Sequence, residues 1–245
     1  MSAVALSPIS GLSPRSWGRI AGLCETLEGT TSAYGQVIVL GRLIAVGSAA
    51  TTAANVLGHE RLLWVGFASS VVGVGFHLAW AALFYELFKP VSKRISRLAA
   101  FVILVGCAVQ ALTCVLYIAP LAVLKGTTSL GAFTAEQLQG LALTLFKING
   151  QAFDTYLIFF GFWCVLNGYL IFRSTFMPRI LGILLTISGV GWMIFLFPPF
   201  AHSVFRYIAI ASALGELPLQ MWLLIMGVNS ESWKARANAA AVSAA

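Results

Sequence analysis

The chain has 245 residues, of which 59% are hydrophobic and only 9% are charged, and its mean hydropathy is +0.90. These values lie outside the range of soluble domains and within that of membrane proteins, which excludes a soluble globular fold. The net charge of +7 comes from 15 Lys and Arg against 8 Asp and Glu. Because the basic residues lie at predicted helix ends and in short loops, they indicate membrane topology, and nucleic acid is not a predicted partner.

Six windows of the sequence are long enough and apolar enough to cross a hydrocarbon core of ~30 Å, which takes about 20 helical residues. The sequence therefore predicts an all-α fold, a polytopic membrane helical bundle of about six transmembrane helices in contact with the lipid bilayer. We expect one membrane domain over residues 18–228, with polar tails over residues 1–17 and 229–245. The windows run from Gly18 to Leu40, Leu62 to Phe88, Leu98 to Leu121, Ile148 to Phe172, Pro178 to Phe197 and Tyr207 to Val228.

The first window is the least apolar, because its segment GLCETLEGTTSAYGQ contains two acids and several hydroxyl groups. An alternative interpretation of this window is an amphipathic helix on the membrane surface. The basic residues favour a span: with six spans, ten Lys and Arg lie on one side and five on the other. Lys and Arg are retained on the cytoplasmic side during insertion, so both termini are predicted to be cytoplasmic, in an inner (cytoplasmic) membrane. The Ser- and Pro-rich segment before this window does not resemble a secretory signal.

The connections between the spans carry their own signals. Residues 47–60 are typical of a short interfacial helix that leads into the second span. Thr134 and Gln137 have the spacing of a capping box, which predicts a helix from about residue 135 with a break at residues 149–150. Pro198 and Pro199 are expected to end the fifth helix, because proline lacks the amide proton that continues the hydrogen-bond ladder.

Acidic residues occur inside the predicted spans, where a charged carboxylate costs ~3 kcal/mol even on the mildest insertion scale. Residues of this kind usually face a protein interior or a wet cavity and indicate a functional site. The acids concerned are Glu25, Glu28, Asp154, Glu216 and, marginally, Glu86.

Polar residues in five spans recur three or four positions apart, so each set lies on one helix face. The faces include Glu25, Glu28, Ser32 and Gln36 in span one, Ser70, Gly73 and His77 in span two, Cys107, Gln110, Cys114 and Tyr117 in span three, Asp154, Gly161, Cys164 and Gly168 in span four, and Ser212, Glu216 and Gln220 in span six. At a rise of ~1.5 Å per residue, Glu28, His77, Gln110 and Glu216 lie ~14–18 Å from the cytoplasmic helix ends. This common depth predicts one layer near the bilayer midplane.

Two of the five acids, Asp154 and Glu86, are expected at the membrane surfaces. Asp154 falls near the outer surface, within reach of Arg206. Glu86 falls near the cytoplasmic surface, beside Lys89 and Lys93. Both are therefore predicted to be members of surface ion pairs.

Glu28, Glu216 and His77 are the candidate catalytic residues. Two carboxylates near a histidine, in surroundings of low dielectric constant, suit proton donation and acceptance with the imidazole as a relay. The candidate ligand-binding residues are Glu25, Gln110, Trp80 and Gln220. The alternative is a hydrogen-bonded polar cluster that holds helices together and has no other function. Aromatic residues of spans two and four would suit a hydrophobic ligand or a developing cation, although most are assigned to packing.

No metal and no cofactor are predicted. The four cysteines, Cys24, Cys107, Cys114 and Cys164, lie in predicted spans without CxxC spacing or the clustering of a zinc site, so they are interpreted as packing residues. Of the three histidines only His77 is deep, which gives no axial pair for a haem. Lys147 lies at the outer boundary, so a retinal Schiff base is not predicted either.

Several segments carry a resemblance to a known family: TAANVLGHERLLWVGF at 52–67, LFKPVSKRISRLAAF at 87–101, FDTYLIFFGFWCVLNGYLIFRSTFMPRILGILL at 153–185 and GELPLQMWLLIMGV at 215–228. With them the chain resembles, over most of its length, an uncharacterised bacterial family of six-span membrane proteins, domain of unknown function number 4386. The resemblance implies the membrane topology and implies no particular activity. The first span of that family is more apolar, so Glu25 and Glu28 depart from its pattern.

The leading hypothesis is a membrane protein whose helices enclose an acidic and aromatic cavity for a hydrophobic small molecule, such as a lipid or isoprenoid. Acid–base chemistry on that ligand is the enzymatic version of this hypothesis. Two alternatives stay open. One is an accessory subunit of a larger complex, with membrane-protein partners, and the other is a proton-coupled transporter. The lack of a visible internal repeat counts against the transporter.

Overall fold

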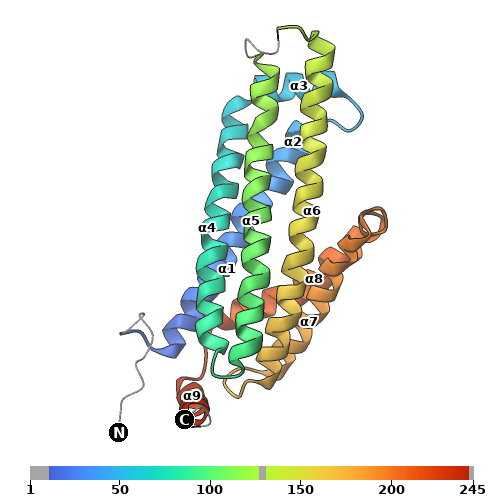
Figure 1. The fold of residues 1–245 in the computed structure, drawn as a ribbon. Helices are drawn as coiled ribbons and strands as arrows, with labels where there is room; N and C mark the ends of the chain where they lie inside the picture. Colours follow the sequence, from blue (N-terminus) through green and yellow to red (C-terminus); the bar gives the residue numbers. More distant parts are fainter. Residues whose placement is uncertain (1–10, 127–130, 243–245) are drawn as a thin grey trace. The chain divides into compact units, whose positions relative to one another are not determined.

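The computed structural model describes residues 11–126 and 131–242, and every regular element in these residues is a helix (Figure 1). In chain order the helices are α1 Pro14–Ala33, the π-helix η1 Tyr34–Val39, α2 Leu40–Leu43, α3 Ala49–Gly58, α4 Glu60–Phe88, α5 Lys93–Leu124, α6 Ala135–Arg173, α7 Arg179–Met193, the 3-10 helix η3 Ile194–Leu196, α8 Pro198–Ile225 and α9 Ser230–Val242. The all-α prediction is confirmed.

Five segments are long and apolar enough to cross a membrane: α4, α5, α6, α7 together with η3, and α8. Their large apolar side chains extend to the surface, as at Phe101, Val115 and Ile187, where bilayer lipid is the solvent that suits them. The chain is therefore a multi-pass membrane protein. Because α1 is not among the five, the count of six spans and the cytoplasmic placement of both termini stay predictions.

The chain folds into two compact units. Unit 1 comprises residues 1–26, 77–106 and 157–245, and unit 2 comprises residues 27–76 and 107–156. Helices α1, α4, α5 and α6 contribute residues to both units. The assignment of residues 18–228 to one membrane domain stays a prediction.

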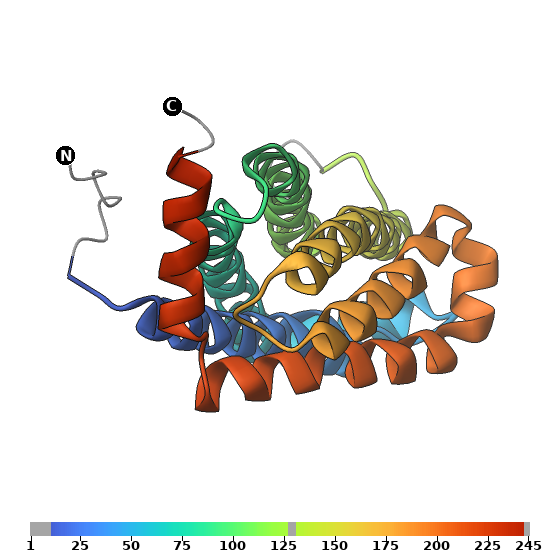
Figure 2. The same ribbon diagram turned by 90° about the horizontal axis from the view of Figure 1, so that it is seen from below.

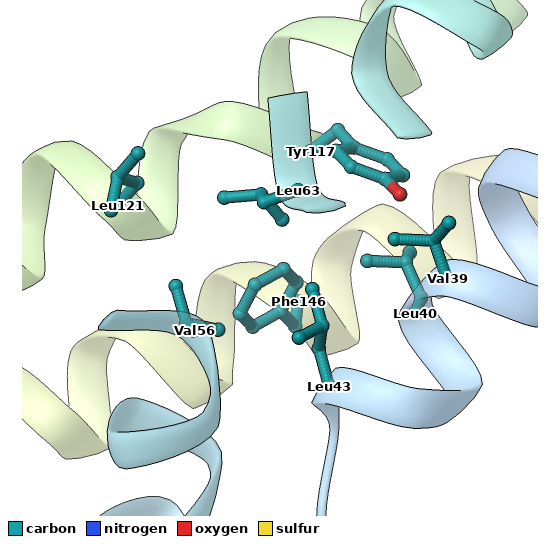
Figure 3. Packing of buried hydrophobic residues seen from close by; sticks show 8 residues of the cluster. All are labelled: Val39, Leu40, Leu43, Val56, Leu63, Tyr117, Leu121 and Phe146. Atoms are coloured by element: carbon teal, nitrogen blue, oxygen red, sulfur yellow. The ribbon is translucent and has the colours of Figure 1, made fainter. Parts of the chain in front are cut away.

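The core of unit 2 is a cluster of buried side chains from η1, α2, α3, α4, α5 and α6 (Figure 3). Its members are Val39, Leu40, Leu43, Val56, Leu63, Tyr117, Leu121 and Phe146. Next to this core, η1 approaches α4 closely because both carry glycine: a Cβ atom at Gly35 would lie 2.7 Å from the carbonyl oxygen of Gly66. The hydroxyl of Tyr117 donates a hydrogen bond to the carbonyl oxygen of Gly35 at 3.0 Å.

Two helix starts form as the sequence predicts. In α3 the preceding residue Ser48 accepts a hydrogen bond from the amide of Thr51 at 3.2 Å. The α6 capping box is complete: the amide of Thr134 donates to Gln137 Oε1 at 2.9 Å, and the amide of Gln137 donates to Thr134 Oγ1 at 3.3 Å. These bonds satisfy amide groups that have no partner within the helix.

Two other predictions about helix ends differ from the structure. The predicted break at residues 149–150 is wrong, since α6 runs through them. The Asn149 side chain donates to the carbonyl oxygen of Thr113 at 2.7 Å, so it does not compete for the hydrogen bonds of its own helix. The prolines at 198–199 begin α8, and α7 ends earlier, at Met193. Proline is well suited to the first helical turn, where its missing amide proton has no partner to lose.

In unit 1, α7 and α8 lie side by side (Figure 2), and α6 packs against α7 through glycine. A Cβ atom at Gly182 would lie 2.5 Å from the carbonyl oxygen of Gly168, and one at Gly189 would lie 2.6 Å from that of Gly161. These distances are far below van der Waals contact, so backbone meets backbone here. Glycine at these positions therefore permits the close packing of α6 and α7.

The segment after residue 228 contains helix α9, which is attached to unit 1 by a tryptophan. Trp233 is buried, and its Nε1 donates to the carbonyl oxygen of Leu87 at 2.8 Å. Its ring meets that of Trp17 edge-on, with 5.5 Å between the ring centroids. The predicted polar tail therefore includes an ordered helix with its own packing contact.

We expect Gly182→Ala to lower the thermal unfolding temperature of the detergent-purified protein by several degrees, because the new methyl group meets the α6 backbone. Gly150→Ala is the matched control. No heavy atom lies within 4 Å of a Cβ atom at Gly150, so this change should be neutral, or stabilising by ~0.5–1 kcal/mol through helix propensity. Equal unfolding temperatures for the two variants would contradict the close packing of α6 and α7.

Candidate functional site

The predicted site residues fall in both units. Glu28 and Gln110 belong to unit 2, and the others belong to unit 1: Glu25, His77, Trp80, Glu216 and Gln220. Five of the seven are buried, with exposed fractions of 1% for Glu25, 6% for Glu28, 0% for His77, 3% for Gln110 and 1% for Trp80. Glu216 and Gln220 are half-buried. The single midplane layer stays a prediction.

In unit 2, Glu28 is the centre of a hydrogen-bonded group that also contains Ser32, Gln110 and Tyr156, here called the Glu28 cluster. Glu28 Oε1 accepts hydrogen bonds from Ser32 Oγ at 3.0 Å, from Gln110 Nε2 at 3.0 Å and from Tyr156 OH at 3.4 Å. The donors come from α1, α5 and α6. All four side chains are buried, so this carboxylate takes its stabilisation from the protein and not from solvent.

The donors and acceptors of the Glu28 cluster are not balanced. Gln110 Nε2 also donates to Ser32 Oγ, at 3.1 Å, so both of its amide protons are used. This orientation follows from the carboxylate, because Glu28 Oε1 requires a donor and only the NH₂ side of the amide provides one. The carbonyl oxygen Oε1 of Gln110 is buried, and no hydrogen-bond partner for it occurs among the described residues.

A second layer of hydrogen bonds joins the same helices. Thr113 Oγ1 donates to the main-chain carbonyl oxygen of Gln110 at 2.7 Å, and Gln36 Nε2 donates to Thr113 Oγ1 at 3.4 Å. Asn149 Nδ2 donates to the carbonyl oxygen of Thr113 at 2.7 Å. These bonds hold α5 at the position in which Gln110 reaches the carboxylate.

Sequence reasoning paired Glu28 with Gln110 but missed Tyr156, Thr113 and Asn149 as members of this network. A signal for Tyr156 exists on α6. Buried and half-buried residues recur there at the spacing of a single helix face: Asn149, Phe153, Tyr156, Phe160, Trp163 and Asn167. Tyr156 is the hydroxyl-bearing member of this face, seven residues after Asn149.

The π-helix η1 begins two residues after Ser32 and was not predicted. Its Gly35 supplies the carbonyl oxygen that accepts from Tyr117 OH. Single π-helical turns within α-helices occur frequently at functional sites. The segment that carries Glu28 and Ser32 therefore continues into backbone geometry that is uncommon in ordinary packing helices.

In unit 1, His77 is enclosed by three aromatic rings. The centroid of its ring lies 5.3 Å from that of Trp80, 5.8 Å from that of Phe160 and 6.1 Å from that of Trp163. Trp80 Nε1 is another buried polar atom for which the described residues provide no hydrogen-bond partner, as are Trp17 Nε1, Ser212 Oγ and Trp222 Nε1.

Glu216 joins α7 to α8 within unit 1. Its Oε1 accepts from Ser188 Oγ at 2.5 Å and from Trp192 Nε1 at 2.7 Å. Gly215 permits this approach, since a Cβ atom there would lie 2.7 Å from Ser188 Cβ. Gln220 follows one turn later on α8, and Glu25 is buried on the unit 1 part of α1.

The other candidate residues are placed as follows. Glu86 pairs with Lys89 at 3.5 Å, which confirms the predicted ion pair, and its place at the cytoplasmic membrane surface stays a prediction. Asp154 is half-buried, and its pairing with Arg206 stays a prediction. All four cysteines are buried and form no disulfide, as expected of packing residues. Within residues 11–126 and 131–242, no group of three or more His, Cys, Asp or Glu is placed to hold a metal ion.

The model of the family Domain of unknown function (DUF4386) matches residues 20–227. The chain belongs to this family. This confirms the resemblance seen in the sequence, and the match includes the whole Glu28 cluster and Glu216. An uncharacterized protein of Archaeoglobus fulgidus is 29% identical to this DUF4386 chain over 150 residues, which are 60% of the chain and 74% of the relative. No solved structure matches it.

For this DUF4386 protein, we expect Ser188→Ala to destabilise the α7–α8 pair, because Glu216 loses the hydrogen bond from the Ser188 hydroxyl. Hydrogen bonds to charged groups contribute ~1.5–3 kcal/mol, less where solvent competes. Ser203→Ala is the control: this exposed hydroxyl donates only within its own helix, to the carbonyl oxygen of Phe200. Thermal unfolding in detergent should show a lower midpoint for Ser188→Ala alone, and equal midpoints would contradict a stabilising role of Glu216.

Proposed function

We propose that this DUF4386 member binds a hydrophobic small molecule, such as a lipid or isoprenoid, at the Glu28 cluster of unit 2. The observation that carries this proposal is the side-chain oxygen Oε1 of Gln110, which has no hydrogen-bond partner among the described residues. A buried polar atom without a hydrogen bond costs ~1–3 kcal/mol, and such atoms are rare in native proteins. A cluster whose only role was to hold helices together would gain stability by pairing this atom.

The composition of the surroundings supports a ligand that is mostly apolar. Five helices present large apolar side chains to lipid, so a hydrophobic molecule can reach the protein from the bilayer. Beside the cluster, the ring of Phe153 lies 5.5 Å from that of Tyr156. Binding sites for small molecules typically combine an apolar lining with a few convergent polar groups, which is the composition found here.

Acid–base chemistry is the enzymatic version of the proposal. Glu28 is its natural centre, because a carboxylate that accepts three hydrogen bonds is held in one position, as a proton acceptor must be. Tyr156 supplies a hydroxyl proton at the same oxygen. Glu216 as a second acid and His77 as a relay complete the proposed set, with Glu25, Trp80 and Gln220 as ligand contacts. We place the protein in a cytoplasmic membrane with both termini inside.

The test is the small-molecule content of the purified protein. Wild type, extracted in a mild detergent, should retain a hydrophobic compound that mass spectrometry detects at near-stoichiometric amounts. Gln110→Met, which keeps the side-chain volume and removes the unpartnered oxygen, should lose most of it. Glu86→Gln, a change at the surface ion pair, is the control and should retain it.

Two outcomes would overturn the proposal. One is a wild-type protein that contains no such compound, and the other is equal content in wild type and Gln110→Met. Stoichiometric recovery of a second membrane protein without a small molecule would favour the accessory-subunit alternative. For the enzymatic version, the Glu28→Gln protein should retain the bound compound, because the amide oxygen still accepts hydrogen bonds. It should no longer convert that compound into product, because the amide cannot exchange the proton.

A further inference from the structure

We infer that the polar group of the ligand is a hydrogen-bond donor without negative charge, either a hydroxyl or an ammonium group, and that an anionic head group is rejected. This inference rests on the proposed function, since it concerns the ligand of the same cluster. It follows from two features of unit 2: the use of the donors and the remaining acceptor.

Every side-chain donor of the Glu28 cluster is already directed at an acceptor in the protein. The Ser32 hydroxyl and the Tyr156 hydroxyl donate to Glu28 Oε1, and the two amide protons of Gln110 go to Glu28 Oε1 and Ser32 Oγ. A ligand that offers only acceptors, such as a phosphate or carboxylate, would have to displace one of these bonds. Each displaced bond would leave Glu28 less well stabilised in buried surroundings.

One acceptor of the cluster, in contrast, is not used. Gln110 Oε1 is buried at a residue with 3% exposure, and within the described part of the chain it receives no hydrogen bond. A ligand hydroxyl or ammonium group supplies the missing proton without breaking any existing bond. The free-energy penalty of the unpaired acceptor is then removed on binding, which increases the affinity for such a ligand.

The test compares three probes that share one saturated chain and differ in head group: hexadecanol, hexadecylamine and palmitate. Binding to the full-length protein in nanodiscs of zwitterionic lipid is measured by displacement of radiolabelled hexadecanol or hexadecylamine, at mildly alkaline pH where palmitate is ionised. We expect the alcohol, the amine or both to bind at least ~10-fold more tightly than palmitate, a ratio that corresponds to ~1.4 kcal/mol. The ranking of alcohol and amine identifies which donor the site takes.

Two variants test whether Gln110 causes the preference for donor head groups. Gln110→Met should bring the three probes to within a factor of about two, since only apolar contacts with the chain remain, whereas Gln151→Met, an exposed glutamine on α6, should leave the preference intact. If Gln110→Met does not fold, the wild-type ranking alone decides. Palmitate binding as tightly as the other two would overturn this inference and leave the proposed function standing. No binding of any probe, with no compound in the purified protein, would overturn both.

Discussion

The structure depends on the requirement that polar groups inside an apolar helical protein find their hydrogen bonds within the protein. The backbone meets this requirement by forming helices, because each helix satisfies its own amide and carbonyl groups. Polar side chains meet it by bonding across helices. Glu28 accepts from donors on α1, α5 and α6, and Glu216 accepts from Ser188 and Trp192 on α7. In lipid, an apolar helix face has a similar free energy against lipid and against another helix, so these hydrogen bonds help to specify which helix faces meet.

Glycine supplies the second condition, which is close approach of the backbones. Hydroxyl and amide side chains are short, and they reach a carboxylate on another helix only if the helix axes are near. Gly215 gives Ser188 its access to Glu216, and the Gly35–Gly66 contact brings η1 against α4 in unit 2. The polar bonds and the glycine contacts therefore depend on one another, and a side chain added at such a glycine would weaken the neighbouring hydrogen bond as well as the packing.

Hydropathy and helix chemistry predicted the all-α fold, five of the apolar spans and the starts of α3 and α6, because each of these is a property of a short segment. The pairing of Glu28 with Gln110 was also accessible, since a constant rise per residue places both at a common depth. The contact of Tyr156 with Glu28 could not be predicted, because Tyr156 is one of many aromatic residues on α6. The π-helix η1 depends on contacts with α4 and α5, so its own sequence holds no signal for it. Because proline lacks an amide proton, it is compatible both with the end of one helix and with the first turn of the next. The sequence alone therefore did not show that Pro198 begins α8.

The balance of donors and acceptors separates the two intramembrane carboxylates that hydropathy treated alike. At Glu216, the hydroxyl of Ser188 and the indole of Trp192 are both satisfied by the carboxylate, and the side chain is half-buried at the contact of two helices. These contacts are sufficient to explain Glu216 as a bond between α7 and α8. At Glu28, the same kind of bonding uses every donor and still leaves the carbonyl oxygen of Gln110 without one. The unpaired side-chain oxygen of Gln110 is therefore the feature on which the proposal of a ligand site at the Glu28 cluster rests.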